Sequence, residues 1–501
     1  MDFSTIMEAA APVFSLQGIF WMFLGSLAGV FLGAVPGISS GMAVALLLPL
    51  TYSIGALYSV VFLAAVFVGV GYGGGLTAIL LNAPGSPENS ATTLDGYALT
   101  KQGRAGEAIG LANMSSLIGG TFSYFVLLFG VGSLANIALK FGPTELFVIS
   151  MMGVFILGVL GTGSLYKTLA SGFLGLLIGT IGLVPTGEWR GTFGSMFLAE
   201  GVQIIPVLIG TFVISEILIH IRDGFVSGNS GELSGLRQIF VGMRDCLKFP
   251  ATIVRSSLIG CLIGIVPAAG ATLASFASYS WAKATTKGPN NFGEGRPEGV
   301  IAAECANNAC YGGALLTALS LGVPGSVTTA ILLSALTLHG VQPGPRLLIT
   351  DGPLIYGLII SAMVAQFFMV FLSVGAGSFF SRLLQVRSYI LMPMLAFFAI
   401  LGTFALRNAE FDIWTMFLFG VLGFWMKNAN YSPAALVMGV VLGPIADNEM
   451  VRMLQLYGHD WPMTFVTQPI ALGLIIAFAI VIAYFVTIRI RNRSALSDTD
   501  V

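Results

Sequence analysis

Apolar runs of membrane-spanning length follow one another along almost the whole chain. A helix needs roughly 20 apolar residues to cross a hydrocarbon core of about 30 Å. We therefore expect membrane spans or broken spans in these stretches: 18–56, 58–83, 108–138, 145–164, 168–185, 203–220, 250–282, 300–342, 352–378, 390–408, 412–427, 432–444 and 464–488. The pattern predicts an all-α, multi-pass membrane protein with roughly ten to thirteen spans, depending on which runs are hairpins.

Proline-centred breaks lie within or directly after four of these segments, and they form two matched pairs. GVFLGAVPGISSGMAVALLLP (29–49) is echoed by GCLIGIVPAAGATLASFASYS (260–280). YGGGLTAILLNAPGS (72–86) is echoed by YGGALLTALSLGVPGS (311–326). Proline removes a backbone donor and disrupts the preceding helical turn. Because a broken helix is tolerated at membrane depth only where it lines a cavity or is buried in protein, matched breaks in two halves indicate a transporter's substrate site.

The spacing of the breaks indicates two homologous halves. Pro36 corresponds to Pro267 and Pro84 to Pro324, with offsets of 231 and 240 residues. An extra loop at 283–299 accounts for the difference between the two offsets. We therefore divide the chain into a first membrane repeat at 1–220, a polar joint at 221–249, a second membrane repeat at 250–488 and a cytoplasmic tail at 489–501.

The basic residues favour repeats of inverted topology, because Lys and Arg mark cytoplasmic loops. Lys101 and Arg104 follow the second break of the first half, where the second half has only Arg346. The loop after the first break shows the opposite asymmetry: only the second half carries basic residues there, among them Lys283 and Arg296.

Composition excludes several classes of protein. Of 501 residues, 56% are hydrophobic and only 9% are charged, whereas an average soluble domain is about 25% charged. The net charge of −1 gives no reason to expect a nucleic-acid partner. The three histidines are scattered, and GTGSLYKT lacks the glycine that a phosphate-binding loop needs before Lys167. We therefore expect no metal centre, no nucleotide and no other cofactor.

The breaks are candidate sites for an anion. A helix that restarts after a break presents free N–H groups and the positive end of its dipole. A single break of this kind is also explained by a simple proline kink, but four breaks in matched pairs favour a functional site. The candidate substrate-binding residues are Pro36, Gly37, Ser39, Ser40, Asn82, Pro84, Gly85, Ser86, Pro267, Gly270, Thr272, Pro324, Gly325 and Ser326.

A polar stripe within an apolar segment is a candidate cation site. Glu304, Asn307, Asn308 and Tyr311 are spaced i, i+3, i+4 and i+7, so they share one face of a helix. A carboxylate and two amides supply hard oxygen ligands for a small cation, and an ionisable group at membrane depth is usually functional. We expect Glu304, Asn307 and Asn308 to bind the coupling ion. The alternative is that Glu304 lies near the end of a loop and is hydrated.

A second polar group of residues follows Pro84. We expect Asn82 and Ser86 to line the site, and an exposed loop to account for the polar residues after Pro87, which are Glu88, Asn89, Ser90, Thr92, Thr93 and Asp95.

Four long motifs resemble the large membrane subunit, of the TctA type, of tripartite tricarboxylate transporters. They are GAVPGISSG, the run NAPGSPENSATTLDGYAL–KQGRAGEA, GRPEGVIAAECANNACYGG and GVPGSVTTAILLSALTLHGVQPGP. The resemblance extends from about residue 15 to 490. It implies a bacterial inner-membrane permease that works with a small membrane subunit and a periplasmic solute-binding protein. It also implies import of carboxylated solutes such as citrate, coupling to Na⁺ or H⁺, and an elevator-type fold of inverted repeats with re-entrant hairpins.

These observations predict a gradient-driven importer of a tricarboxylate or a related di- or monocarboxylate, and not an enzyme. An ion or solute channel is one alternative, although it requires an open polar pore. An intramembrane enzyme is another, although the chain has no recognisable catalytic set of residues.

Overall fold

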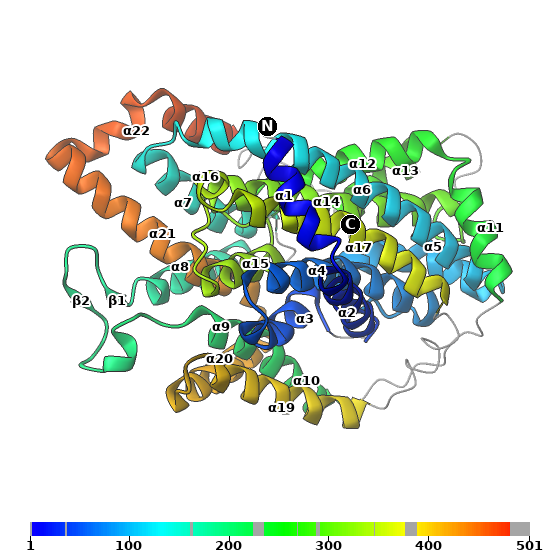
Figure 1. The fold of residues 1–501 in the computed structure, drawn as a ribbon, viewed down its shortest axis with the longest axis horizontal. Coiled ribbons are helices and arrows are strands. Elements are labelled where there is room, and N and C mark those ends of the chain that lie inside the picture. The colour runs from blue at the N-terminus through cyan, green and yellow to red at the C-terminus, as the bar shows by residue number, and fades with distance from the viewer. Residues whose placement is uncertain are drawn as a thin grey trace, which may run out of the picture. The chain divides into compact units, whose positions relative to one another are not determined.

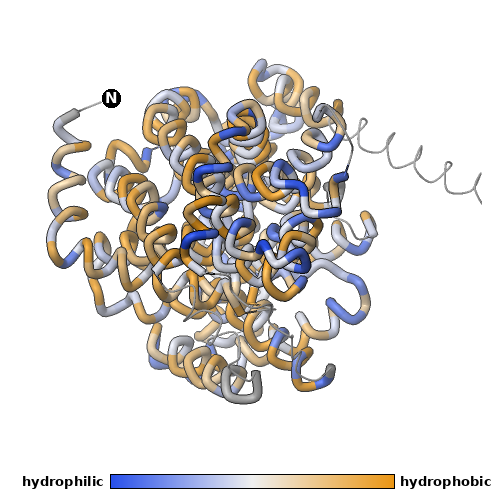
Figure 2. The backbone as a smooth tube through the Cα atoms, turned by 90° about the vertical axis from the view of Figure 1, so that its right-hand side faces the viewer, coloured by the Kyte–Doolittle hydropathy of each residue, from blue (hydrophilic) through white to orange (hydrophobic). Residues whose placement is uncertain are grey.

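The computed structural model describes residues 3–35, 38–160, 164–223, 235–267, 269–286, 291–344, 346–375 and 388–480. The chain divides into two compact units, and each takes segments from both predicted repeats. Unit 1 comprises Met1–Asn136 and Ile205–Phe424, and unit 2 comprises Ile137–Ile204 and Trp425–Val501. The described elements are almost all helices, as the sequence predicts (Figure 1), and Figure 2 shows hydrophobic residues along most of them.

Unit 1 contains both kinds of break. Its first segment forms α1 (Phe3–Val13), α2 (Leu16–Gly33), α3 (Ser40–Leu47), η1 (Leu48–Ser53), α4 (Ala56–Leu81), η2 (Pro87–Asn89), α5 (Ser90–Lys101) and most of α6 (Ala105–Ala138). Its second segment forms α9 (Ile204–Leu208), η4 (Ile209–Ile214), α10 (Ser215–Asp223), α11 (Leu236–Cys246), α12 (Pro250–Ile265), α13 (Gly270–Thr285), α14 (Pro297–Leu321), α15 (Val327–Leu338), α16 (Leu347–Thr350), α17 (Gly352–Gly375), α19 (Ser388–Arg407) and most of α20 (Glu410–Asn428).

Unit 2 is a smaller helical unit with a short hairpin. Its elements are α7 (Pro143–Leu160), α8 (Leu165–Gly179), β1 (Gly182–Leu183), β2 (Trp189–Arg190), η3 (Met196–Leu198), α21 (Pro433–Tyr457), η5 (Gly458–Met463) and α22 (Thr464–Thr467). The two strands pair antiparallel. Arg190 binds both carboxylate oxygens of Asp447, at 2.8 and 3.0 Å, and so joins the hairpin to α21. α8 packs closely on α21, where backbone at Gly175 meets backbone at Gly439.

Six described helices are long and apolar enough to cross a membrane. They are Leu16–Gly33, Ala56–Leu81, Ala105–Ala138, Ile204–Arg222, Gly352–Gly375 and Pro433–Thr467. The pair α11 and α12, bent by 81°, makes a seventh if it is counted as one span. Several predicted runs instead contain shorter apolar helices: the run 18–56, for example, holds α2, α3 and η1.

Local sequence signals set the starts of several helices. Ser15 caps α2 by accepting the N–H of Gly18 at 3.1 Å, and Ser432 caps α21 in the same way. Proline occupies the first position of α12, α14 and α21, where its missing N–H costs nothing because the first helical N–H groups have no intrahelical partner.

Glycines allow two helix pairs in unit 1 to approach backbone to backbone. α2 packs on α4 through Gly29 and Gly33, where an added Cβ would overlap or crowd the carbonyl oxygens of Val66 and Val70. α12 packs on α14 in the same manner, since a Cβ on Gly264 would overlap the carbonyl oxygen of Cys310. Small residues of this kind let membrane helices gain dispersion contacts that larger side chains prevent.

We predict that Gly264→Ala destabilises the protein, because the new methyl group forces α12 away from α14. Overpacking of this kind costs about 1–3 kcal/mol and lowers the apparent melting temperature of the purified chain. Gly132→Ala is the matched control, since Gly132 is also helical and nothing lies within 4 Å of its would-be Cβ. Equal melting temperatures for Gly264→Ala and Gly132→Ala would contradict this packing argument.

Candidate functional site

The first break separates α2 from α3, as the sequence predicts. Ser39 starts the new helix, because its Oγ accepts the N–H of Met42 at 3.2 Å. Ser40 is the first residue of α3 and is buried. Pro36 and Gly37 lie outside the described residues.

The corresponding break of the second half separates α12 from α13. Pro267 lies in the turn between them, and Gly270 begins α13 with a φ of +72°. That left-handed conformation favours glycine over other residues. Thr272 lies in the first turn of α13 and is half-buried.

The second kind of break follows a helix that ends in a left-handed residue. α4 ends at Asn82, with a φ of 55°, and α14 ends at the corresponding Gly322, with a φ of 74°. The side chain of Asn82 is exposed, and the residue acts here as a helix C-cap. Pro84 follows, and the N–H of Gly85 then donates to the carbonyl of Gly74 at 3.2 Å, which folds the chain back onto α4.

A reciprocal capping box stabilises the start of α15. Ser326 Oγ accepts the N–H of Thr329 at 3.2 Å, and Thr329 Oγ1 accepts the N–H of Ser326 at 2.8 Å. Pro324 and Gly325 precede this cap, and backbone at Gly325 packs on the Cα of Ala314 in α14. The preceding proline and the cap together fix where α15 begins.

Breaks from the two halves lie together in unit 1. The start of α3 packs on the start of α15, where a Cβ on Gly41 would lie 3.3 Å from Val327 Cγ1. Conversely, α13, which follows the break at Pro267 in the second half, packs on η2, which follows the break at Pro84 in the first half. In both cases, the helix that restarts after a Pro36- or Pro267-type break packs on a segment that follows a Pro84- or Pro324-type break of the opposite half.

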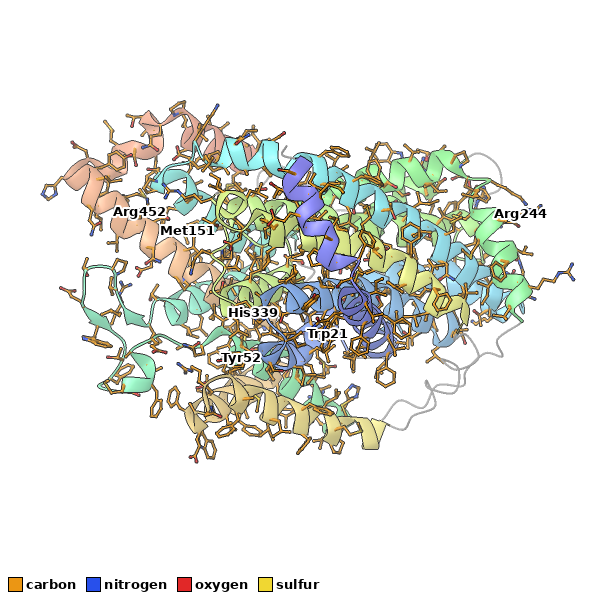
Figure 3. All side chains as sticks on the ribbon, viewed as in Figure 1. Trp21, Tyr52, Met151, Arg244, His339 and Arg452 are labelled. Atoms are coloured by element: carbon orange, nitrogen blue, oxygen red, sulfur yellow. The ribbon has the colours of Figure 1, made fainter. Side chains whose placement is uncertain are left out.

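A contact at the other end of α15 also joins the two halves. His339 Nε2 lies 3.4 Å from Thr51 Oγ1 in η1, and Figure 3 shows His339 close to Tyr52, the next residue along η1. α15 thus contacts the segment α3–η1 near both of its ends.

Glu304 is the centre of a buried hydrogen-bond network. Its side chain is 0% exposed, so the alternative of a hydrated residue at a loop end is wrong. The carboxylate accepts hydrogen bonds from Thr92 Oγ1 at 2.5 Å, Ser116 Oγ at 3.2 Å and Asn89 Nδ2 at 3.3 Å. All three donors come from the first half of the chain, whereas Glu304 comes from the second.

The two asparagines of the stripe are also fully buried, and they are incompletely paired. Asn308 Nδ2 donates to Ser116 Oγ at 2.9 Å, but its Oδ1 has no hydrogen-bond partner in the described structure. Neither side-chain polar atom of Asn307 has a partner there. A buried polar group without a partner costs about 1–3 kcal/mol. These atoms therefore have the capacity to bind water or an ion.

Asn89 links the network at Glu304 to the break at Pro84. Its Oδ1 accepts a hydrogen bond from Ser86 Oγ at 2.7 Å, while its Nδ2 donates to Glu304 and, at 3.0 Å, to the carbonyl of Gly71. Ser86 is itself buried. One side-chain amide thus joins a predicted substrate residue to a predicted ion residue.

The interpretation of the residues after Pro87 as an exposed loop is wrong. Asn89, Thr92 and Asp95 are all 0% exposed and belong to η2 and α5. Their polar groups are buried because each has specific partners, mostly from the second half of the chain. A sequence pattern gives no such signal, since Glu304, the residue that both Asn89 and Thr92 bind, is more than 200 residues away.

Asp95 is likewise buried and paired with residues of the second half of the chain. Its Oδ1 accepts the N–H groups of Gly293, Gly295 and Arg296 at 2.7–2.9 Å, and its Oδ2 accepts the hydroxyl of Tyr279. Hydrogen bonds to a carboxylate are stronger than those between neutral groups. Asp95 therefore fastens the loop before α14 to α5.

Comparison with known proteins identifies the family. The model of the tripartite tricarboxylate transporter TctA family matches residues 19–438. An uncharacterised 52.8 kDa protein in the TAR-I ttuC' 3' region of Agrobacterium vitis is 33% identical over 485 residues, which cover 96% of both chains.

A second protein of Agrobacterium vitis, from the TAR-II ttuC' 3' region, is 34% identical over 216 residues, which cover 43% of this chain and 89% of that protein. No solved structure matches. The extent of the family match and the whole-length similarity show that this chain belongs to the TctA family of tripartite tricarboxylate transporters.

Proposed function

We propose that this chain is the permease subunit that imports a carboxylated solute, driven by a Na⁺ or H⁺ gradient. The solute is a tricarboxylate such as citrate or a related di- or monocarboxylate. The observation that carries the proposal is the buried Glu304 network, which joins both halves of the chain and connects directly to a helix break.

The solute is held by backbone N–H groups and hydroxyl groups at the breaks. Among the described residues, no lysine or arginine is buried, so the described part of the bundle supplies no fully buried side-chain cation. The starts of α3 and α15, which pack on one another, supply positive helix ends, and Ser39, Ser40 and Ser326 lie at those starts. Helix starts of this kind favour carboxylate ligands.

The coupling cation binds at Glu304, together with the free oxygen atoms of Asn307 and Asn308. Carboxylate and amide oxygens are hard ligands that suit a small cation. Either Na⁺ or a proton on Glu304 also neutralises a negative charge at a fully buried position, which is energetically favourable. Because Asn89 binds both Glu304 and Ser86, occupancy of the ion site alters the break at which the solute binds.

We also propose that the chain consists of two inverted repeats that move as an elevator. Equivalent contacts in the two halves support the repeats. Gly33 packs on the backbone of Val70, and Gly264, which is 231 residues after Gly33, packs on the backbone of Cys310, which is 240 residues after Val70. All predicted site residues belong to unit 1, which fits a moving unit that carries the breaks.

The partners follow from membership of a tripartite family. We propose that the chain lies in the bacterial inner membrane with a small membrane subunit, and that it receives its solute from a periplasmic solute-binding protein. Reading frames for both partners next to the gene for this chain would support this assignment.

We predict that Glu304→Gln abolishes gradient-driven accumulation of citrate, because the neutral amide cannot exchange a cation. The measurement is uptake into proteoliposomes with imposed Na⁺ or H⁺ gradients, and we expect at least a tenfold fall. Glu145→Gln is the matched control, since Glu145 is also buried but caps the start of α7 in unit 2. Uptake by Glu304→Gln that still follows the ion gradient would refute the proposed ion site.

We further predict that Ser86→Ala weakens both the solute affinity and its dependence on the cation, because Asn89 loses the hydrogen bond that orients its amide. An effect of about three- to tenfold on KM corresponds to the loss of one buried hydrogen bond. Ser115→Ala is the control, as Ser115 is buried but donates only to carbonyls of its own helix. If Ser86→Ala behaves like Ser115→Ala, the link through Asn89 has no role in coupling.

A further inference from the structure

Glu88 places a carboxylate at the point where three of the site's segments meet. It lies in η2, just after the break at Pro84. Its Oε1 accepts hydrogen bonds from the hydroxyl of Ser40, the first residue of α3, and from the phenol of Tyr311 in α14, the latter at 2.7 Å. Both donors are buried, whereas Glu88 itself is only half-buried.

This position is one where an anion is stabilised. The first N–H groups of a helix have no intrahelical partners and carry a partial positive charge. In α3, the side chain of the capping residue Ser39 accepts only one of these N–H groups, that of Met42. The start of α15 packs on the same turn of α3, so a second positive helix end lies beside the one whose first residue binds Glu88. A solute carboxylate would be attracted to the same place for the same reason.

An unsatisfied amide lies one helical turn from Tyr311 and has the capacity to bind a further ligand. Asn307 lies four residues before Tyr311, on the same face of α14, and both of its side-chain polar atoms are buried without a partner in the described structure. Its Nδ2 is a free donor for a carboxylate, while its Oδ1 remains available for the cation. The hydrogen bonds of Ser40 and Tyr311 to Glu88 leave this amide unused.

We propose that Glu88 is an internal anion that occupies the carboxylate subsite in the absence of solute and is displaced when a solute carboxylate binds. The incoming carboxylate takes over the hydroxyl groups of Ser40 and Tyr311 and adds the Nδ2 of Asn307. This inference rests on the proposed function and assigns one subsite within it. Glu88 thereby sets the solute affinity, because every solute must compete with a carboxylate that is already bound.

If Glu88 competes with the solute, removing its charge lowers the Kd for the solute, and the direction of this change tests the proposal. In Glu88→Gln the amide oxygen still accepts from Ser40 and Tyr311, but the negative charge is gone. We therefore expect the Kd for citrate or succinate to fall about tenfold, measured by calorimetric titration of the purified full chain in nanodiscs. A structural role for Glu88 predicts the opposite sign, so a Kd that rises or stays unchanged would overturn the proposal.

The control is Glu8→Gln, which makes the same change of charge at an exposed residue of α1 and is expected to leave the Kd unchanged. If Glu88→Gln does not fold, Glu88→Asp replaces it. Its shorter side chain withdraws the carboxylate from Ser40, so it too is expected to lower the Kd, by about threefold, and a raised Kd would again overturn the proposal.

A further variant identifies the shared donor. Ser40→Ala in the Glu88→Gln background should raise the Kd again, because the solute loses a hydroxyl donor that the amide no longer contests; an unchanged Kd would show that Ser40 does not belong to the subsite. Failure of the proposed function has a different signature. In that case neither citrate nor succinate binds to the wild type, to Glu8→Gln or to Glu88→Gln.

Discussion

The buried carboxylate of Glu304 is the constraint on which the rest of the site depends. An unpaired charge in the interior of a membrane protein is very costly, so it must be matched by donors or by a cation. The chain supplies three donors from its first half, Asn89, Thr92 and Ser116, and leaves buried amide atoms nearby without partners. Because hydrogen bonds partly balance the charge of Glu304 and nearby ligand atoms remain free, this site can bind and release a cation.

The same constraint explains why polar side chains gather around the breaks. A break frees backbone groups that need partners, and a charge on a neighbouring helix needs donors. Asn89 satisfies both needs at once, as it binds Ser86 at the break and Glu304 on α14. In this arrangement the solute site and the ion site share a residue, and coupling between them needs no long-range pathway.

Much of this arrangement could be predicted from the sequence, because breaks and buried charges leave local patterns. Pro84 and Pro324 revealed the interruptions, and the spacing of Glu304, Asn307 and Asn308 revealed a polar helix face. The partners of Glu304 could not be predicted, since they depend on how α5 and α6 pack on α14. Thr92 and Asp95 looked like loop residues because local polarity does not distinguish hydration from buried pairing. The division into two units was also hidden, because each unit joins segments that are distant in sequence.

The most direct measurement of the central claim is the cation uptake that accompanies solute binding to the purified chain. Calorimetric titration of citrate in buffers of different ionisation enthalpy reports proton uptake, and the dependence of the citrate Kd on Na⁺ concentration reports Na⁺ uptake. The account predicts that the wild type takes up a cation with each solute and that Glu304→Gln takes up none. Equal cation uptake by the two proteins, or solute binding without any cation, would contradict it.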